Sequence, residues 1–193
     1  MSGSDEGHYR IRETSEVYAG WTNLLVATVQ LPDGRTIKRE IEDHGEAICV
    51  LPYHPGRKTA VLVRQPRTPV LFAARQAHTL EAIAGVIEEE DPRACAHREA
   101  MEEAKLKLEA LEHVFTAWTM PGISTERMYF YLAQYSGPAR PEIKGGVDDD
   151  EDTVALEISL AELARMADAN ELPDAKTLVL LQTLRLRRAE LFR

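Results

Sequence analysis

Three glutamates stand close together in residues 98–103, and their spacing suits the binding of a hard metal ion. On a helix that turns by about 100° per residue, Glu99, Glu102 and Glu103 share one face. The opposite face carries small or apolar side chains, those of Ala100, Met101, Ala104 and Leu108. Mg²⁺ is bound by clustered oxygen ligands of this kind. The pattern predicts a helix that packs on a sheet with one side and presents carboxylates on the other.

A solvated helix face is the alternative interpretation of these charges, because runs of charge commonly lie in solvent. Two features speak against it. No Lys or Arg stands four residues after Glu99 or Glu102 to form the usual stabilising pair. The charges of Glu99 and Glu103 also repel each other when no cation balances them.

The overall composition excludes some classes of function. The 193 residues contain 23 Lys and Arg against 32 Asp and Glu, a formal net charge of −9. General affinity for nucleic acid or an anionic membrane is therefore not expected. The two cysteines, Cys49 and Cys95, indicate no disulfide framework. No apolar run approaches the about 20 residues of a membrane span, and residues 1–10 lack signal-peptide features, so we expect a cytoplasmic protein.

The helix that carries the glutamates has clear boundaries in the sequence. Asp91 is a suitable N-cap and Pro92 a suitable first residue, and the helix is expected to run to about Ala104. Strands are predicted near 47–51, 59–63, 79–84, 115–119, 128–135 and 154–158, and further helices after Ser159 and Asp174. We therefore predict an α/β fold with a mixed sheet over residues 45–193.

Residues 1–44 are expected to form a separate region. Strand patterns at 9–20, 21–31 and 35–42 surround a turn at Pro32-Asp33-Gly34. They predict a small antiparallel sheet. Residues 138–152 are rich in Pro and Gly and then acidic, and they are predicted to form a loop.

The segment from Gly85 onward resembles the Nudix box. Gly85 and five residues lead to Asp91, and six more residues lead to the intact box core Arg98-Glu99-Ala100-Met101-Glu102-Glu103. Three features depart from the pattern. Asp91 replaces a glutamate, with Glu90 adjacent; the spacer is one residue shorter; and Lys105 replaces the glycine that normally ends the helix, which puts the helix terminus in question.

Further segments resemble the ADP-ribose and GDP-mannose pyrophosphatases of this superfamily. In order along the chain they are residues 62–67, 81–85, 118–122 and 145–152 and the pair Lys176-Thr177. The resemblance spans about residues 45 to 185. It implies a Nudix α/β/α sandwich with a mixed β-sheet. It also implies a homodimer formed through the N-terminal sheet, which would contribute to the substrate pocket.

The resemblance implies a set of metal ligands for Mg²⁺, or for Mn²⁺ in its place. Glu99 and Glu103 would be the principal ligands, and Glu102 would share or support the site. The backbone carbonyl of Ala84 would add a further ligand. Arg98 would either orient these carboxylates or form a salt bridge with Glu90 or Asp91.

The acidic run at 148–152 would supply the remaining catalytic groups, by the same resemblance. The alignment places a metal ligand at Glu151 and the general base at Asp149. Because Asp149 is shorter than the glutamate expected there, Asp150 and Glu151 remain alternatives for the base. Gly145-Gly146 would act as the hinge of this loop. A flexible, solvated loop is the alternative interpretation of the run.

Five residues are considered for substrate binding. Arg67, and after it Arg64, would contact phosphate, because a guanidinium binds phosphate oxygens in bidentate fashion; ordinary surface charge is the alternative. Glu81 would add an outer metal contact or bind a ribose hydroxyl, unless it is only an edge-strand carboxylate. Gly122 lies in a tight loop expected near the sugar, and Trp118 could stack on a base or pack in the core.

These residues together favour Mg²⁺-dependent hydrolysis of the pyrophosphate bond of a nucleoside diphosphate sugar. ADP-ribose would give AMP and ribose 5-phosphate, and GDP-mannose would give GMP and mannose 1-phosphate. A Nudix enzyme acting on another nucleoside diphosphate derivative is one alternative. A catalytically impaired Nudix module that binds a nucleotide as a sensor is the other, and Asp91 and Lys105 are the features that support it.

Overall fold

The structure, a computed structural model, describes residues 8–138, 142–144 and 153–193. The chain divides into two compact units. One contains the residues up to 46 together with 117–128, and the other contains 47–116 together with 129–193. The assignment of residues 1–44 to a dimerising region stays a prediction.

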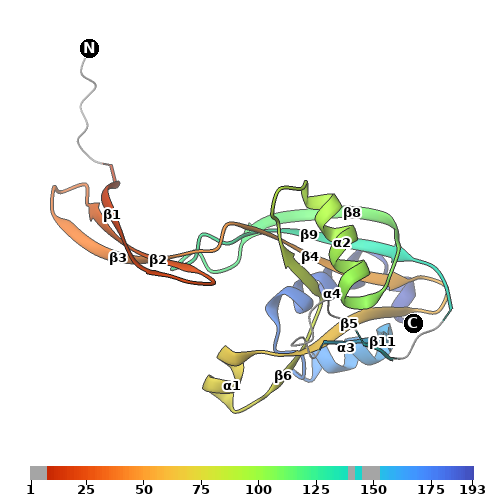
Figure 1. The fold of residues 1–193 in the computed structure, drawn as a ribbon. Coiled ribbons are helices and arrows are strands. Elements are labelled where there is room, and N and C mark those ends of the chain that lie inside the picture. The colour runs from red at the N-terminus through yellow and green to blue at the C-terminus, as the bar shows by residue number, and fades with distance from the viewer. Residues whose placement is uncertain (1–7, 139–141, 145–152) are drawn as a thin grey trace. The chain divides into compact units, whose positions relative to one another are not determined.

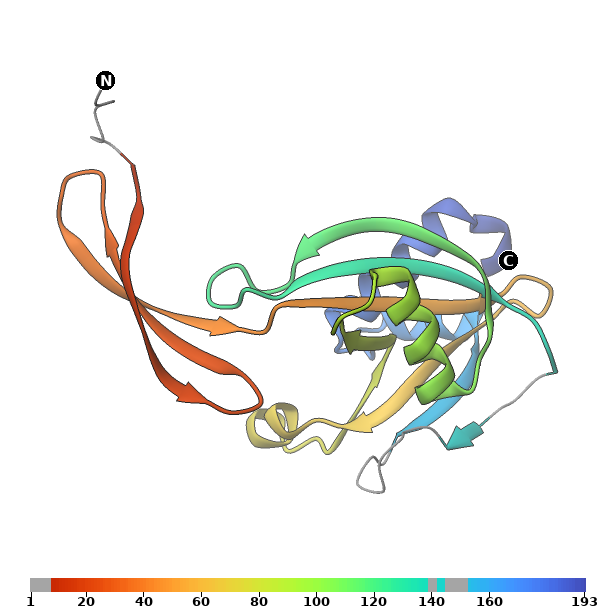
Figure 2. The same ribbon diagram turned by 45° about the horizontal axis from the view of Figure 1, so that its top comes forward.

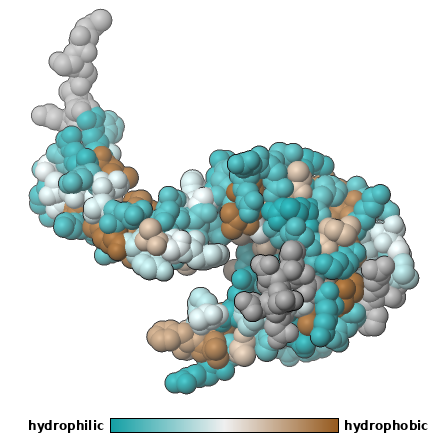
Figure 3. Space-filling model, viewed as in Figure 1, coloured by the Kyte–Doolittle hydropathy of each residue, from teal (hydrophilic) through white to brown (hydrophobic). Residues whose placement is uncertain are grey.

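The first unit is built on a three-stranded antiparallel sheet (Figure 1). Its strands are β1 (Arg10–Ala19), β2 (Asn23–Gln30) and β3 (Thr36–Asp43), in the order β1-β2-β3. The predicted small N-terminal sheet is therefore confirmed. Apolar residues lie among hydrophilic ones over these strands (Figure 3). Several of the large ones are exposed, namely Tyr9, Ile11, Val17, Tyr18 and Trp21.

The second unit contains most of an eight-stranded sheet. Its strands are β4 (Glu46–His54), β5 (Thr59–Pro66), β6 (His78–Glu81), β7 (Ile83–Val86), β8 (Leu108–Trp118), β9 (Arg127–Tyr135), β10 (Glu142–Lys144) and β11 (Val154–Ser159). The order is β10-β11-β5-β4-β9-β8, with β6 paired to β5 and β7 paired to β4. The central strand β4 is almost wholly buried, and β5 is buried over its apolar run Ala60–Val63.

Helices cover both faces of this sheet. Helix α2 (Pro92–Ala104) lies on one face, and α3 (Leu160–Asp168) and α4 (Ala175–Arg187) lie on the other (Figures 1 and 2). Small buried residues of α2 pack against the sheet, and buried leucines of α3 and α4 fill the opposite layer. A short helix α1 (Thr68–Ala74) follows β5, and a 3₁₀ turn η1 (Ala189–Phe192) follows α4. The predicted α/β/α sandwich with a mixed sheet is confirmed.

Local signals explain where the helices begin. The Asp91 side chain accepts hydrogen bonds from the backbone N–H groups of Arg93 and Ala94 at 2.9 and 3.1 Å, and Pro92 follows it. Ser159 and Asp174 cap α3 and α4 in the same way. Each predicted helix start is confirmed.

Lys105 ends helix α2 in a left-handed conformation, with φ of 52°. Its N–H donates to the carbonyl of Met101 at 3.1 Å, and the N–H of Leu106 donates to that of Ala100 at 2.9 Å. This is the cap that a glycine usually forms. The helix therefore ends where the box pattern places its end, although a residue with a Cβ stands there.

Four details differ from the sequence predictions. Leu108 does not continue the apolar face of α2; it begins β8, which is longer than the predicted strand at 115–119. Residues 79–84 do not form one strand, because the chain changes pairing partner at Ala82. Strand β10 lies within the predicted loop at 138–152, and α1 was not predicted.

Among the described residues, no helix combines the length and apolar character that a membrane crossing requires.

Candidate active site

Helix α2 places Glu99 on its buried side, against strand β7. Glu99 is 9% exposed, so one of the three glutamates does not lie on the solvated face that the helical wheel predicted. Its side chain occupies the space that a Cβ at Gly85 would need: such a Cβ would stand 1.9 Å from Glu99 Oε1. Burial raises the pKa of the Glu99 carboxyl, and the Arg98 charge acts against this rise. The box glycine therefore makes room for a buried carboxylate.

Arg98 connects three carboxylates. Its Nη1 lies 2.7 Å from Glu99 Oε1 and 2.9 Å from Glu102 Oε2, and its Nη2 lies 2.7 Å from Glu90 Oε1. Both interpretations of Arg98 fit this geometry, because the same side chain forms the salt bridge with Glu90 and orients Glu99 and Glu102. Asp91 caps the helix instead. Arg98 precedes Glu102 by four residues, so the two form an i,i+4 pair on the helix, a pairing that the absence of a cation after the glutamates does not exclude.

Glu103 is half-buried on the next turn of the helix. Its charge contributes to the raised pKa of the Arg67 guanidinium, after the larger effect of the hydrogen bond to Glu81. Burial raises the pKa of the Cys49 thiol strongly, and the Glu103 charge adds to that rise. Glu103 thus lies within electrostatic range of Arg67 and of the buried strand β4.

Arg67 and Glu81 form a bidentate ion pair. Arg67 Nε lies 2.8 Å from Glu81 Oε1, and Nη2 lies 2.8 Å from Oε2. Thr79 donates a hydrogen bond to the same carboxylate, and Lys176 Nζ lies 3.5 Å from it. Burial alone would raise the pKa of Glu81, but the hydrogen bonds from Arg67 and Thr79 prevail and lower the pKa to about 2. Glu81 is therefore a fully ionised anchor for Arg67 at neutral pH.

A cavity of about 230 Å³ opens beside this ion pair. Arg67 and Lys176 bring two positive charges to its wall, and Glu81 and Asp174 bring two negative ones. Lys176 Nζ lies 2.6 Å from Asp174 Oδ1. The guanidinium and the ammonium group are the features of this cavity that suit a phosphate.

The remaining predicted residues lie in different places. Ala84 is half-buried on β7, paired with Cys49 of β4. Arg64 is exposed on β5, and among the described residues its side chain forms no ion pair. Gly122 lies in the first unit, in the connection from β8 to β9. Asp149, Asp150 and Glu151 lie outside the described residues.

Gly122 borders a hollow of about 480 Å³ that belongs wholly to the first unit. Arg39 and Ile41 of β3 line one side, and Trp118 and Ile123 line the other. Trp118 is 57% exposed, so it is not the core residue that aromatic strand residues usually are. Its ring is accessible to a flat ligand.

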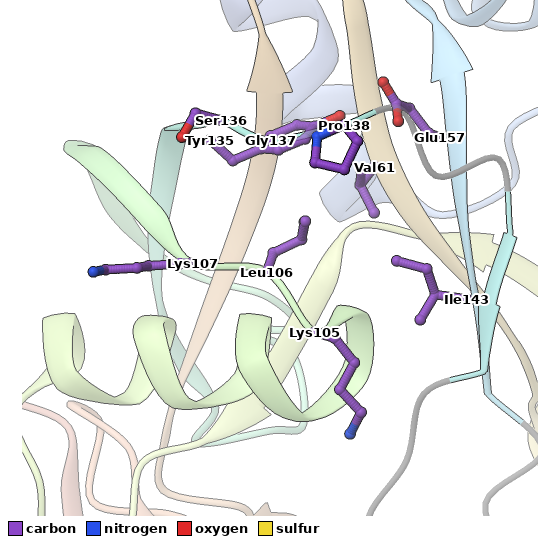
Figure 4. A pocket seen from close by; sticks show the side chains of 10 residues that line it. All are labelled: Val61, Lys105, Leu106, Lys107, Tyr135, Ser136, Gly137, Pro138, Ile143 and Glu157. Carbon is purple, nitrogen blue, oxygen red and sulfur yellow. The ribbon is translucent and has the colours of Figure 1, made fainter.

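A further hollow, of about 150 Å³, lies beyond the C-terminal end of α2. Val61, Leu106 and Ile143 point into it, and the amino groups of Lys105 and Lys107 point away (Figure 4). The lining carboxylate of Glu157 accepts hydrogen bonds through Oε1 from Arg57 Nε and Thr59 Oγ1, each at 2.7 Å.

The donor set on α2 fits a hard cation in its chemistry. Glu99, Glu102 and Glu103 supply only oxygen atoms, and Arg98 already draws oxygens of two of them to a single positive group. Gly85 keeps space around the Glu99 carboxylate. Among the described residues, however, no three His, Cys, Asp or Glu side chains converge closely enough to hold a metal. A metal would therefore have to displace Arg98 from the carboxylates or bind beside it.

Sequence reasoning missed how the start of α4 joins this site. Asp174 was predicted only as a helix cap, and Lys176 and Thr177 only as part of a family resemblance. In the structure, Asp174 and Lys176 line the same cavity as Arg67 and Glu81. A lysine two residues after a capping aspartate was the available signal, but no local pattern shows which strand this helix start will meet.

With the geometry in place, comparison with known proteins identifies the class. The chain matches the family model of the NUDIX domain over residues 44–181 and belongs to the Nudix family. The prediction of a Nudix hydrolase is confirmed. In structure, the chain is similar to one solved as the "Crystal structure of ADP compounds hydrolase", with a TM-score of 0.75 and 18% identity over 97% of this chain and 98% of that one.

Particular relatives are more similar in sequence. The chain is 36% identical over 158 residues to a GDP-mannose pyrophosphatase of Cronobacter sakazakii, covering 80% of this chain and 82% of that protein. It is 34% identical over 157 residues to a GDP-mannose pyrophosphatase of Escherichia coli O1:K1 / APEC, with 80% and 82% covered.

Proposed function

We propose that this protein is a Mg²⁺-dependent pyrophosphatase of a nucleoside diphosphate sugar. The observation that carries the proposal is one electrostatic cluster in the second unit, in which Glu103 of the carboxylate helix α2 lies within electrostatic range of Arg67, the partner of Glu81. A pyrophosphate diester needs both groups: cation-binding oxygens to neutralise its charge and a guanidinium to hold its phosphates. The names of the sequence relatives favour GDP-mannose as substrate. ADP-ribose is the alternative substrate that the resemblance implies.

The metal would be held by Glu99 and Glu103, with Glu102 in support and the Ala84 carbonyl as a further ligand. Glu151, outside the described residues, would complete the set. When bound, Mg²⁺ would neutralise phosphate charge and favour the ionisation of a water molecule. Mn²⁺ offers the same oxygen-seeking chemistry.

The side chains of the chain itself have separate roles in this proposal. Arg67 binds phosphate oxygens and is kept charged and oriented by Glu81. Arg64, exposed on β5 three residues before Arg67, adds a second positive charge. Asp149 takes the proton from the attacking water, with Asp150 or Glu151 as the alternatives. Because that water is a weak nucleophile, the reaction needs such a base.

The hollow of the first unit suits the base and sugar of the nucleotide. Trp118 presents an accessible ring, and Gly122 leaves the backbone open to a ligand. The protein would form a homodimer through the N-terminal sheet, as the resemblance implies, and this region would contribute to the substrate pocket. The exposed apolar side chains on β1 and at its flanks support such an interface. The composition is consistent with action in the cytoplasm.

A nucleotide sensor without catalysis is the second candidate, because Arg98 neutralises two of the three glutamates in this structure. The two functions are separated by a phosphate-release assay. Purified protein, Mg²⁺ and a phosphatase that acts on monoesters are incubated with GDP-mannose, ADP-ribose, ADP-glucose, UDP-glucose, NADH or nucleoside triphosphates. We expect preferred release from GDP-mannose or ADP-ribose, abolished by Glu103→Gln. Binding of a nucleotide without any release, with Mn²⁺ also tried, would favour the sensor.

A further inference from the structure

Thr177 joins the start of α4 to the strand segment that carries Glu81. It is 1% exposed, and its hydroxyl uses both of its hydrogen-bonding roles. Oγ1 accepts a hydrogen bond from the backbone N–H of Ala82 at 2.6 Å and donates one to Asp174 Oδ2 at 2.6 Å. A buried hydroxyl satisfied on both sides fixes the distance between the elements it connects.

Ala82 stands at the point where the chain changes its pairing partner. The preceding strand β6 pairs with β5, and the following strand β7 pairs with β4. Ala82 belongs to neither ladder and is fully buried. A buried backbone N–H needs a partner, and the Thr177 hydroxyl is that partner.

We propose that Thr177 is a positioning residue for substrate binding, and this rests on the proposed function. Glu81 directly precedes Ala82 and holds the Arg67 guanidinium by two hydrogen bonds of 2.8 Å. A shift of the backbone at Ala82 therefore moves Glu81 and turns Arg67 away from the phosphate. Thr177 acts through this pair and does not touch the substrate.

The effect should fall on substrate binding rather than on the metal ligands. Beyond Ala82, the strand is held independently, because Ile83 pairs with Val50 and Ala84 pairs with Cys49. The Ala84 carbonyl thus keeps its place when the Thr177 hydroxyl is lost. This separation gives the proposal a kinetic signature that general destabilisation does not have.

The test compares Thr177→Val, which keeps the shape and removes both hydrogen bonds, with Thr177→Ser, which keeps the hydroxyl. For GDP-mannose hydrolysis with Mg²⁺, we expect Thr177→Val to raise KM by about tenfold. The kcat and the Mg²⁺ concentration for half-maximal rate should stay within about twofold. Thr177→Ser should restore KM. A fall in kcat at unchanged KM, or no rescue by serine, would overturn the proposal.

A double-mutant cycle with Arg67→Ala tests the route of the effect. Without Arg67, Thr177→Val should raise KM no further, because the group it positions is gone. An equal rise of KM in both backgrounds would overturn the proposal. If Thr177→Val does not fold, Thr177→Cys replaces it. The cysteine side chain has a volume similar to that of threonine, and its thiol forms weaker hydrogen bonds. KM should then rise by a smaller factor, again only when Arg67 is present.

The same variants separate this inference from the proposed function. If the wild-type protein hydrolyses none of the nucleoside diphosphate sugars, the proposed function fails. The dissociation constant of GDP, measured by calorimetry, then replaces KM in every comparison. An Arg67-dependent weakening of GDP binding in Thr177→Val would sustain the positioning role. Unchanged GDP binding, or no GDP binding by the wild type, would overturn it.

Discussion

The carboxylate of Glu99 lies so close to the Cα of Gly85 that a methyl group on residue 85 would stand 1.9 Å from Glu99 Oε1 and 2.1 Å from Cδ. The two residues come from different elements, β7 and α2. They are separated in the chain by the acidic segment 87–91 and the first half of the helix. Glycine at position 85 is thus a condition for a buried carboxylate at position 99.

Gly85→Ala should displace the Glu99 carboxylate and lower kcat by about 100-fold, because misplacement of a catalytic group by about 1 Å has effects of that size. The measurement is the rate of GDP-mannose hydrolysis at saturating Mg²⁺ and substrate. The matched control is Gly56→Ala, where a Cβ would stand 3.3 Å from a ring carbon of His54. Full activity in folded Gly85→Ala would contradict the role of this contact.

Mg²⁺ should stabilise the folded protein through the carboxylates of α2. At about 100 times its Kd, a ligand adds about 2.7 kcal/mol to the free energy of unfolding, which corresponds to a rise in Tm of about 5–10 °C for a chain of this size. Glu99→Gln should abolish the rise in a thermal unfolding experiment. The control Glu190→Gln, at an exposed residue of η1, should retain the Mg²⁺-induced rise in Tm. Loss of the rise in Glu190→Gln but not in Glu99→Gln would place the metal elsewhere.

Replacement of Lys105 by glycine should stabilise the protein by about 0.5–1 kcal/mol, since Lys105 has a φ of 52° at the end of α2 and glycine adopts this conformation without strain. The weak hydrogen bond from Lys105 Nζ to the Glu102 carbonyl is exposed and adds little. Urea unfolding measures the change. Lys107→Gly, at a residue without positive φ, should give no gain, and destabilisation by Lys105→Gly would contradict the strain argument.

The Glu81 carboxylate should make stability fall at low pH. Because its pKa is lowered to about 2 in the folded protein, its contribution is complete above the unfolded-state pKa of about 4.3 and is lost as the pH falls toward 2. The difference in unfolding free energy between wild type and Glu81→Gln should therefore shrink between pH 6 and pH 3. Glu88→Gln, at an exposed residue, should show no such narrowing; a constant difference for Glu81→Gln would contradict the lowered pKa.

The parts of this fold that follow from local rules were predictable from sequence. Asp91 and Pro92 determine where α2 begins, and the alternation in residues 21–31 indicates a strand whatever it pairs with. The split at Ala82 was not predictable, because both neighbouring segments read as one β-forming run. Only the choice of pairing partner, β5 or β4, divides them.

At the candidate site, too, local sequence patterns predict single elements but not the contacts between them. The spacing of residues 98–103 predicted a carboxylate helix, but the burial of Glu99 depends on Gly85, which lies on another element. The bidentate pair of Arg67 with Glu81 joins residues whose separate roles the sequence left open. Asp174 and Lys176 lie beside that pair because of how α4 packs against the sheet. Local sequence patterns do not predict this packing.

The most direct test of the central claim is product analysis of GDP-mannose hydrolysis in Mg²⁺ by wild-type protein, Glu103→Gln and the control Glu190→Gln. Chromatography separates GMP, GDP, mannose and mannose 1-phosphate. The account predicts equal amounts of GMP and mannose 1-phosphate from wild type and control, and a loss of both with Glu103→Gln. Release of GDP and free mannose, or equal rates in wild type and Glu103→Gln, would contradict cleavage of the pyrophosphate bond by this site.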